Sequence, residues 1–493
     1  MRIIPFLIVL SATFSCSALT SYQSEISTPL DYYHSGNAQD AATEMSAIAD
    51  DEAESNSTVI FHLEASTMLR DAGNYQASFE YLERAEQIIK SGYDERGRMM
   101  AAANQAVDGG MLSQKGMAYT GYVHDRVMLN TYKALNMLSL NKLDDALVEA
   151  RRINQAQVRG ISELNYDIQE SRQDSSSSLA DSSLSFMDAI SLDGFSTKSS
   201  SQPSSAVYSS FGRFPANQNY DNDFSTFVVG LLRRISGGGE NPEWDFKRLH
   251  DSHPDSVAIA GELAAIRAGN RADGWGYVIF ENGIAPYREE VEFAIPVGYL
   301  KALFSNSSKV SDVYSLTYLS LPRIMNGVPA TNAGLVLSAE NGLLMNTEIM
   351  TDMTDLVEFE FEERFSSILL RELVSTVLKS IAIDAGGDVI EKAVGEGMDE
   401  NEQLALGFFA GILKSWTSSA LSQADDRSWR SGAARFEVAR FPLEGIEGLS
   451  LALGDNPQVG AQVTIPQGCK NVVVMVRSIS PDHVMTAHVV GIK

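Results

Sequence analysis

Histidine, cysteine and serine motifs supply most nucleophiles and metal ligands, so they show first what chemistry a chain can do. The 493 residues contain seven His and two Cys, but no Gly-x-Ser-x-Gly, His-Glu-x-x-His, Walker loop or Cys-x-x-Cys. We interpret His250 and His253, which precede Pro254, as a solvated helix end rather than a metal site. His483 and His488 lie five apart on an expected strand, which would place them on opposite faces. We therefore expect no catalytic residue, metal or cofactor.

Two groups of charged residues remain. Asp426, Arg427 and Trp429 form a polar cluster that could bind a ligand. We favour a buried pair between Arg427 and Asp425 or Asp426, which would fix the following strand. A second, acidic group is predicted to be a solvated face and comprises Glu358, Glu360, Glu362 and Glu363.

Cys16 is the residue that points most directly to a modification. A basic residue, an apolar run from Ile3 to Leu10 and small residues precede it, which is the layout of a secretory signal peptide. Thr13–Cys16 is similar to a bacterial lipobox, although Thr13 replaces the usual Leu and Phe14 is bulky. We expect cleavage after Ser15 and lipid on Cys16, with Ser17 favouring the outer membrane. An ordinary signal peptide with an incidental Cys is the alternative.

Helical periodicity dominates residues 29–154. Three similar turns begin at Gly36, Gly73 and Asn141, and their spacings of 37 and 68 residues are close to one and two 34-residue periods. Such a period is typical of tetratricopeptide repeats, in which helical hairpins stack. Small residues at Ala85 and Ala150 would let these helices approach closely. A generic antiparallel helical bundle is the alternative, and in either case His62 is expected to be a packed or half-exposed helix residue.

The remaining chain divides by composition and periodicity. A Ser-rich stretch is predicted to be a linker, and residues 224–270 to be helices that include a stop at Gly237–Gly239. Alternation then indicates strands, with Asn282-Gly283 as a hairpin turn. Five final strands between Phe436 and Gly491 fit an antiparallel meander or sandwich, and the apolar run Leu404–Trp416 is expected to be a buried helix.

Three blocks together resemble a family of uncharacterised bacterial envelope lipoproteins with tetratricopeptide-like N-termini. They are Leu129–Asn154, Phe280–Pro286 with the following Glu289 and Glu290, and Asp425–Arg430. The Ser-rich linker and the lipobox depart from the family pattern. The resemblance implies a location in the cell envelope, and it carries no established activity.

The amino-acid composition limits the classes of partner that the protein can bind. The chain has 38 basic and 64 acidic residues and a net charge of −26, so its field repels nucleic acid. We predict a multidomain α+β protein: signal peptide 1–15, tether 16–28, tetratricopeptide-like helices 29–170, linker 171–223, helical hairpins 224–270 and an α+β domain 271–493. The predicted function is a non-enzymatic periplasmic scaffold, lipid-anchored to the outer membrane, that binds envelope proteins in a helical groove. The alternative is a cell-wall-directed enzyme or carbohydrate-binding accessory with its site in residues 273–493.

Overall fold

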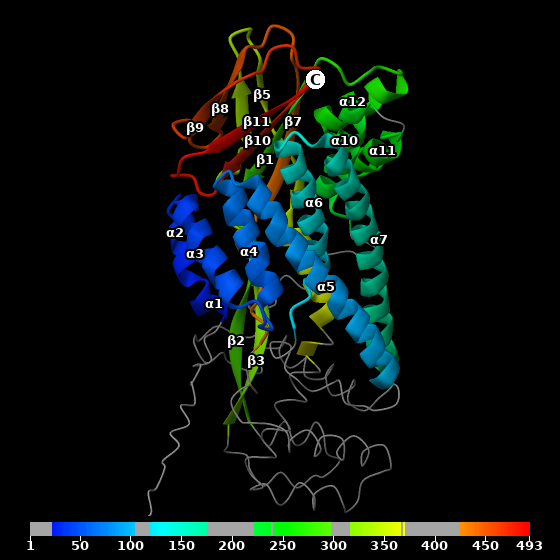
Figure 1. Cartoon of the computed structure of the whole chain (residues 1–493), viewed down its shortest axis with the longest axis vertical. Helices are drawn as coiled ribbons and strands as arrows, with labels where there is room; N and C mark the ends of the chain where they lie inside the picture. The colour runs from blue at the N-terminus through cyan, green and yellow to red at the C-terminus, as the bar shows by residue number, and fades with distance from the viewer. Residues whose placement is uncertain are drawn as a thin grey trace, which may run out of the picture.

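The computed structural model describes residues 22–103, 118–174, 221–237, 240–296, 316–365, 368–369 and 424–493. Helices come first and sheets follow, so the chain is a mixed α+β protein, as the sequence predicts (Figure 1). The signal peptide, Cys16, most of the Ser-rich linker and Leu404–Trp416 lie outside the described residues.

The helices pack largely in chain order. The N-terminal ones are α1 (Tyr22–Glu25), α2 (Ser27–His34), α3 (Ala38–Asp51), α4 (Thr58–Asp71), α5 (Tyr75–Ala103), α6 (Val123–Ser139) and α7 (Leu143–Asp174). Three more follow the Ser-rich stretch and confirm the predicted helices there: α10 (Asp223–Ser236), α11 (Glu243–Ser252) and α12 (Val257–Arg267). Because α7 continues to Asp174, the predicted linker starts a few residues too early.

Three helical hairpins turn at the positions that the sequence singles out. Gly36, Gly73 and Asn141 all have left-handed backbones, with φ of 81°, 81° and 58°. A left-handed residue just after a helix lets the chain reverse, and Gly and Asn adopt this conformation most easily. The turns separate α2 from α3, α4 from α5, and α6 from α7.

The strands within the described residues form two larger sheets and a separate ribbon. The five-stranded sheet has the order β11-β10-β1-β7-β6 and contains β1 (Trp275–Asn282), β6 (Glu348–Asp352), β7 (Arg435–Pro442), β10 (Asn471–Ser478) and β11 (Thr486–Ile492). The four-stranded sheet has the order β5-β4-β8-β9 and contains β4 (Leu335–Ser338), β5 (Leu344–Asn346), β8 (Gly448–Leu453) and β9 (Gly460–Thr464). The ribbon of β2 (Tyr287–Pro296) and β3 (Leu316–Met325) extends away from both (Figure 1).

Of the two arrangements predicted for the last five strands, the structure fits the sandwich, because these strands are shared between two sheets that enclose a core. One prediction about strand pairing is wrong. Asn282-Gly283 is not a hairpin turn, because β1 pairs with β10 in parallel and with β7 rather than with β2. Asn282 is instead buried. Its side-chain amide donates to the carbonyl of Thr331 and accepts from the backbone N–H groups of Ala330 and Thr331.

Side chains of β1 alternate between two cores. Tyr277 and Ile279 belong to a core shared with the helices, whereas Val278 and Phe280 belong to a core between the two sheets. The five-stranded sheet is therefore the middle of three layers. Every residue of α4 from Thr58 to Arg70 is buried, because neighbouring helices and the C-terminal part of the chain together cover it.

The N-terminal tether is shorter than predicted. Residues 22–25 form α1 and residues 27–34 form α2, although residues 16–28 were expected to be a tether. Tyr22 is only 2% exposed, and its hydroxyl donates to Glu64 of α4 and to the carbonyl of Ser428, both at 2.8 Å. The chain is thus fixed to the folded body from Tyr22 onward.

Candidate functional site

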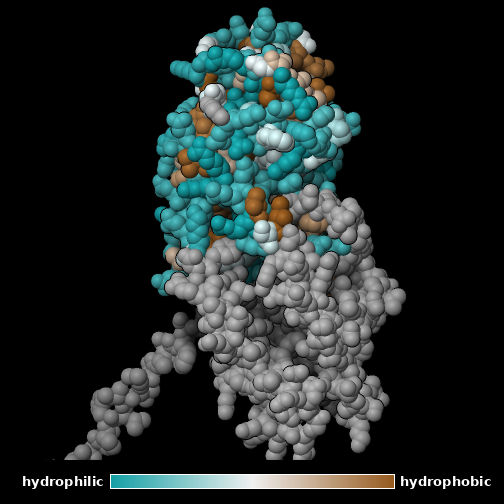
Figure 2. Space-filling view, turned by 90° about the vertical axis from the view of Figure 1, so that its right-hand side faces the viewer, coloured by the Kyte–Doolittle hydropathy of each residue, from teal (hydrophilic) through white to brown (hydrophobic). Residues whose placement is uncertain are grey.

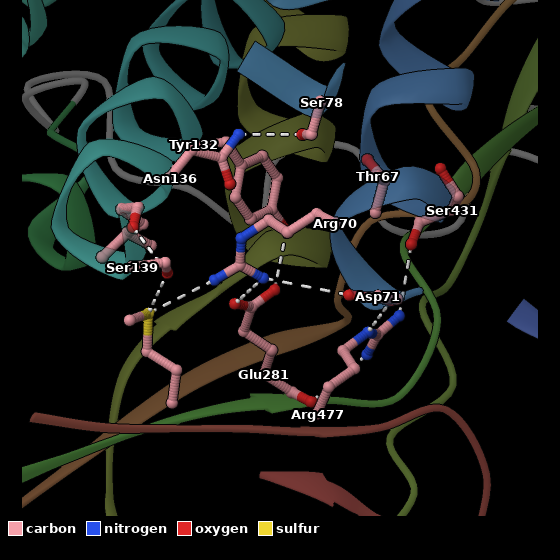
Figure 3. Close-up of polar contacts among 12 residues, drawn as sticks. Thr67, Arg70, Asp71, Ser78, Tyr132, Asn136, Ser139, Glu281, Ser431 and Arg477 are labelled. Carbon is pink, nitrogen blue, oxygen red and sulfur yellow. Dashed lines mark hydrogen bonds and ion pairs between the residues drawn. The ribbon is translucent and has the colours of Figure 1, made fainter. Parts of the chain in front are cut away.

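A buried ion pair joins the helices to the sheet (Figure 3). Arg70 of α4 lies 2.6 Å from the carboxylate of Glu281 on β1, and the hydroxyl of Tyr132 donates to that carboxylate at 3.1 Å. Burial raises the pKa of Glu281, whereas the charge of Arg70 opposes that rise. The pair connects two layers that lie far apart in the sequence.

A second buried pair lies beside the first. Arg477 of β10 contacts Asp71 at 3.1 Å and donates to the hydroxyl of Tyr33 at 3.0 Å. Its guanidinium also donates to the carbonyls of Gly283 and Ser431, at 2.5 and 3.2 Å. Because the two arginines and two acids balance in charge and are hydrogen-bonded, this network has the features of a structural link.

Residues 424–432 form an irregular segment on the inner side of the helices. Glu64 of α4 accepts from the backbone N–H groups of Arg430 and Ser431, at 2.6 and 2.9 Å. The indole of Trp429 donates to Thr67 at 2.8 Å. The helices therefore hold this segment by its backbone as well as by its side chains.

The predicted Arg427 pair is confirmed, with Asp425 as the partner. Arg427 donates to Asp425 at 2.7 and 3.0 Å and to the carbonyl of Asn56 at 2.9 Å. Both side chains are buried. Although burial opposes the charge, Arg427 lowers the pKa of Asp425. The favoured interpretation, a pair that fixes the chain before β7, matches this geometry.

Next to this segment is a partly open cavity of about 30 Å³. Its walls come from α6, β2, residues 353–357 and residues 428–436. Arg288 of β2 lines it and is 1% exposed, and its two terminal nitrogens, Nη1 and Nη2, have no hydrogen-bond partner among the residues that the structure describes. The guanidinium carbon lies 3.4 Å from the ring centroid of Tyr122. Burial lowers the pKa of Arg288 to about 10, so it remains charged at neutral pH.

Beside the cavity, His124 of α6 is held between two carboxylates. Its Nδ1 lies 2.7 Å from Glu360, and its Nε2 lies 3.5 Å from Asp125. Burial opposes protonation, but Asp125 and Glu360 together raise the pKa of His124. Glu360 also accepts from the backbone N–H groups of Val123 and His124 at the start of α6, at 2.9 and 3.2 Å. These contacts lower the pKa of Glu360 despite its burial.

The predicted solvated acidic face is therefore wrong for part of its length. Residues 353–365 are helical, and Glu360 is fully buried while Glu358 is 7% exposed. Met353, Leu356, Val357 and Phe361 share the buried side of this helix. An acid at helical spacing from apolar residues was the available signal, and interpreting the run of acids as a solvated face missed it.

The histidines singled out from the sequence are scattered. His62 is buried and bonds the carbonyl of Thr58, so its packed role is confirmed. His253 contacts Asp223 at 2.9 Å and is partly buried. His483 precedes β11, so it does not share a strand with His488, and the prediction of opposite faces is wrong. His488 packs on the ring of Tyr75, with centroids 4.8 Å apart.

Sequence reasoning missed Arg288, Arg70 and Arg477. Arg288 is out of phase with the buried Val291 and Phe293 of its own strand, which places it on the polar side by pattern. On that side, the rings of Tyr122, directly before α6, and of Phe361 lie against its guanidinium. Arg70 and Arg477 stand among ordinary helix and strand residues, and only their distant partners make them notable.

Within the ranges that the structure describes, no helix is long and apolar enough to cross a bilayer, and no three His, Cys, Asp or Glu side chains gather as metal ligands. Comparisons with protein families, curated proteins and solved structures give no match. The family resemblance in the sequence therefore stays a prediction.

Proposed function

We propose that this chain is a non-enzymatic scaffold of the bacterial cell envelope, exported to the periplasm, anchored to the outer membrane by lipid on Cys16, and binding other proteins through tetratricopeptide-like helices. The observation that carries the proposal is how α4 holds residues 424–432. Glu64 binds two consecutive backbone N–H groups of this segment, and Tyr22 binds one of its carbonyls. Helical repeats hold extended peptides by such contacts.

The hairpins support the repeat interpretation. The same left-handed turn recurs at Gly36, Gly73 and Asn141. Ala85 and Ala150, in the second helices of their hairpins, are 0% and 1% exposed. Small buried residues let neighbouring helices pack closely.

The inner surface of this array is already occupied, which changes where a partner would bind. Residues 424–432 and the five-stranded sheet cover α4 and α6. We therefore assign partner binding to the outer faces of the later helices. Val158 of α7 and Trp244 of α11 are 67% and 74% exposed. The face that Figure 2 shows is mostly hydrophilic where the structure is described.

The enclosed environment of the acidic side chains in the sheet favours the scaffold proposal over a cell-wall-directed enzyme. Burial raises the pKa of Glu437 as well as that of Glu281. Glu437, however, accepts from Asn282 at 2.7 Å and from Thr347 at 2.5 Å inside the protein. Carboxylates enclosed in this way position neighbouring elements, whereas a glycosidase acid must face a substrate cleft.

Fractionation tests the anchor. Cys16→Ala should move the protein from the membrane fraction to the soluble periplasm, with Cys469→Ala, which changes a free cysteine, as the matched control. If wild type and Cys16→Ala fractionate alike, the anchor is excluded.

Site-specific photocrosslinking in cells tests the partner surface. A crosslinking residue at Val158 or Trp244 should give adducts with other envelope proteins. Leu344 on β5 is the control, because it is also 74% exposed but lies on the opposite layer. Adducts from Leu344 alone, or from none of the three positions, would contradict the proposed surface.

A further inference from the structure

We propose that the cavity at Arg288 is a binding site for the carboxylate group of a small apolar organic acid. This site is separate from the outer helical faces assigned to protein partners.

The donors of the site are Nη1 and Nη2 of Arg288. Both are buried, neither has a hydrogen-bond partner in the described part of the chain, and they form the outer end of the guanidinium. The ring of Tyr122 covers the guanidinium face at 3.4 Å, so ligands must approach these nitrogens in the guanidinium plane. A carboxylate matches this direction, because its two oxygens accept from the two nitrogens in parallel. A single-atom anion lacks the two separate acceptor atoms that would match the two nitrogens.

Among the described residues, no carboxylate hydrogen-bonds Nη1 or Nη2 of Arg288, although the charges of Asp425 and Glu360 act on it from nearby. Asp425 is bound by Arg427, and Glu360 by His124, Arg364 and two backbone N–H groups. Asp125 accepts from the hydroxyl of Tyr119 and from the backbone N–H of Tyr122, at 2.8 Å for the latter. An isolated buried cation is unfavourable, and one bound monoanion would neutralise it.

The space and its lining define the ligand further. A volume of about 30 Å³ holds roughly two or three waters, which suits the three non-hydrogen atoms of a carboxylate. Met128, Met353, Val357 and Phe436 supply apolar walls. They suit a short hydrocarbon chain and disfavour the larger, doubly charged phosphate.

The experiment measures anion binding by calorimetry on the full-length chain. The probes are sodium propionate, sodium chloride and inorganic phosphate at matched ionic strength. Propionate should bind, and Arg288→Gln should weaken it by about tenfold or more. Arg323→Gln is the matched control, because Arg323 lies on the paired strand β3 but contacts Glu289 at 3.0 Å. Its affinity for propionate should equal that of wild type.

Stability without ligand provides a second readout. If Arg288 is an uncompensated binding group, Arg288→Met should raise the melting temperature of the ligand-free protein. A structural arginine would give a lower melting temperature instead. Ala433→Val, which adds volume to a cavity wall while keeping Arg288, should abolish propionate binding.

Three outcomes would overturn the inference. Chloride or phosphate binding as tightly as propionate would exclude a carboxylate site. Propionate binding that is unchanged in both Arg288→Gln and Ala433→Val would place the ligand elsewhere. Absence of binding by wild type, together with a destabilised Arg288→Met, would make Arg288 a packing residue.

Discussion

Arg427 holds an irregular segment through one carboxylate and one backbone carbonyl. Replacing it with Met would leave Asp425 buried without its partner, at an expected cost of about 3–5 kcal/mol in the free energy of unfolding. Urea unfolding measures this cost. The exposed Arg271→Met is the control, since its side chain is 82% exposed.

A double variant separates lost pairing from lost packing. Asp425→Leu combined with Arg427→Met removes both charges, so it should be more stable than Arg427→Met alone. An equally unstable double variant would show that the ion pair is not what holds this segment.

His124 should give the protein a distinct pH response. The pKa of His124 is raised, so the stability that its charge contributes is present below its unfolded pKa of about 6.5 and is lost as pH rises through the folded value. The advantage of wild type over His124→Gln should therefore be full below about pH 6.5 and shrink as the pH rises above it. Unfolding of both proteins at several pH values measures the difference.

Wild type must be compared with His124→Gln, because other histidines change the stability of the fold with pH in the opposite direction. Burial lowers the pKa values of His34, His62 and His488, so these residues favour the folded state more as pH rises through their unfolded pKa. An advantage of wild type that grows with pH would contradict the paired, charged state of His124.

Only some residues of the candidate site could be predicted from the sequence. Arg427 could be predicted as a buried pair because acids adjoin it in the sequence. Glu360 and Arg288 could not be placed in the same way. Each contacts the start of α6, Glu360 through Val123 and Arg288 through Tyr122, and these partners lie more than 150 residues earlier in the chain.

At the scale of elements, we predict that α7 packs on its neighbouring helices through a small residue. Ala150 is 1% exposed, so Ala150→Leu should force the helices apart and lower the free energy of unfolding by about 1–3 kcal/mol. Thermal and urea unfolding measure this loss. Val148→Leu, at a 42% exposed position on the same helix, should have little effect. A stable Ala150→Leu would exclude the close contact.

Local elements were predictable where periodicity and turn residues agree. The hairpin turns at Gly36 and Gly73 are examples, because a glycine there meets a local conformational need. Strand partners were not predictable, because β1 pairs with β10 across nearly 200 residues of sequence. Asn282-Gly283 shows the limit: Gly283 does have a φ of 78°, but a Cβ there would lie 2.0 Å from the carbonyl oxygen of Val328, so it serves a close approach rather than a hairpin.

At the scale of the whole molecule, helices and sheet share one core. It includes side chains from α4, α10 and β1, and the Arg70–Glu281 pair crosses it. Native-state hydrogen exchange should therefore give amides of α4 and β1 the same opening free energy and denaturant dependence. Exchange from α4 at a clearly lower free energy would mean that helices and sheet unfold separately.

Burial of Tyr22 also determines how far the protein can reach. Six peptide steps separate it from Cys16, and even a fully extended chain spans only about 20 Å over that distance. A lipid on Cys16 would thus keep α1 close to the lipid headgroups and restrict rotation of the whole body. The protein would meet partners in the layer directly above the membrane, and extra residues between Cys16 and Tyr22 would lengthen its reach without altering its fold.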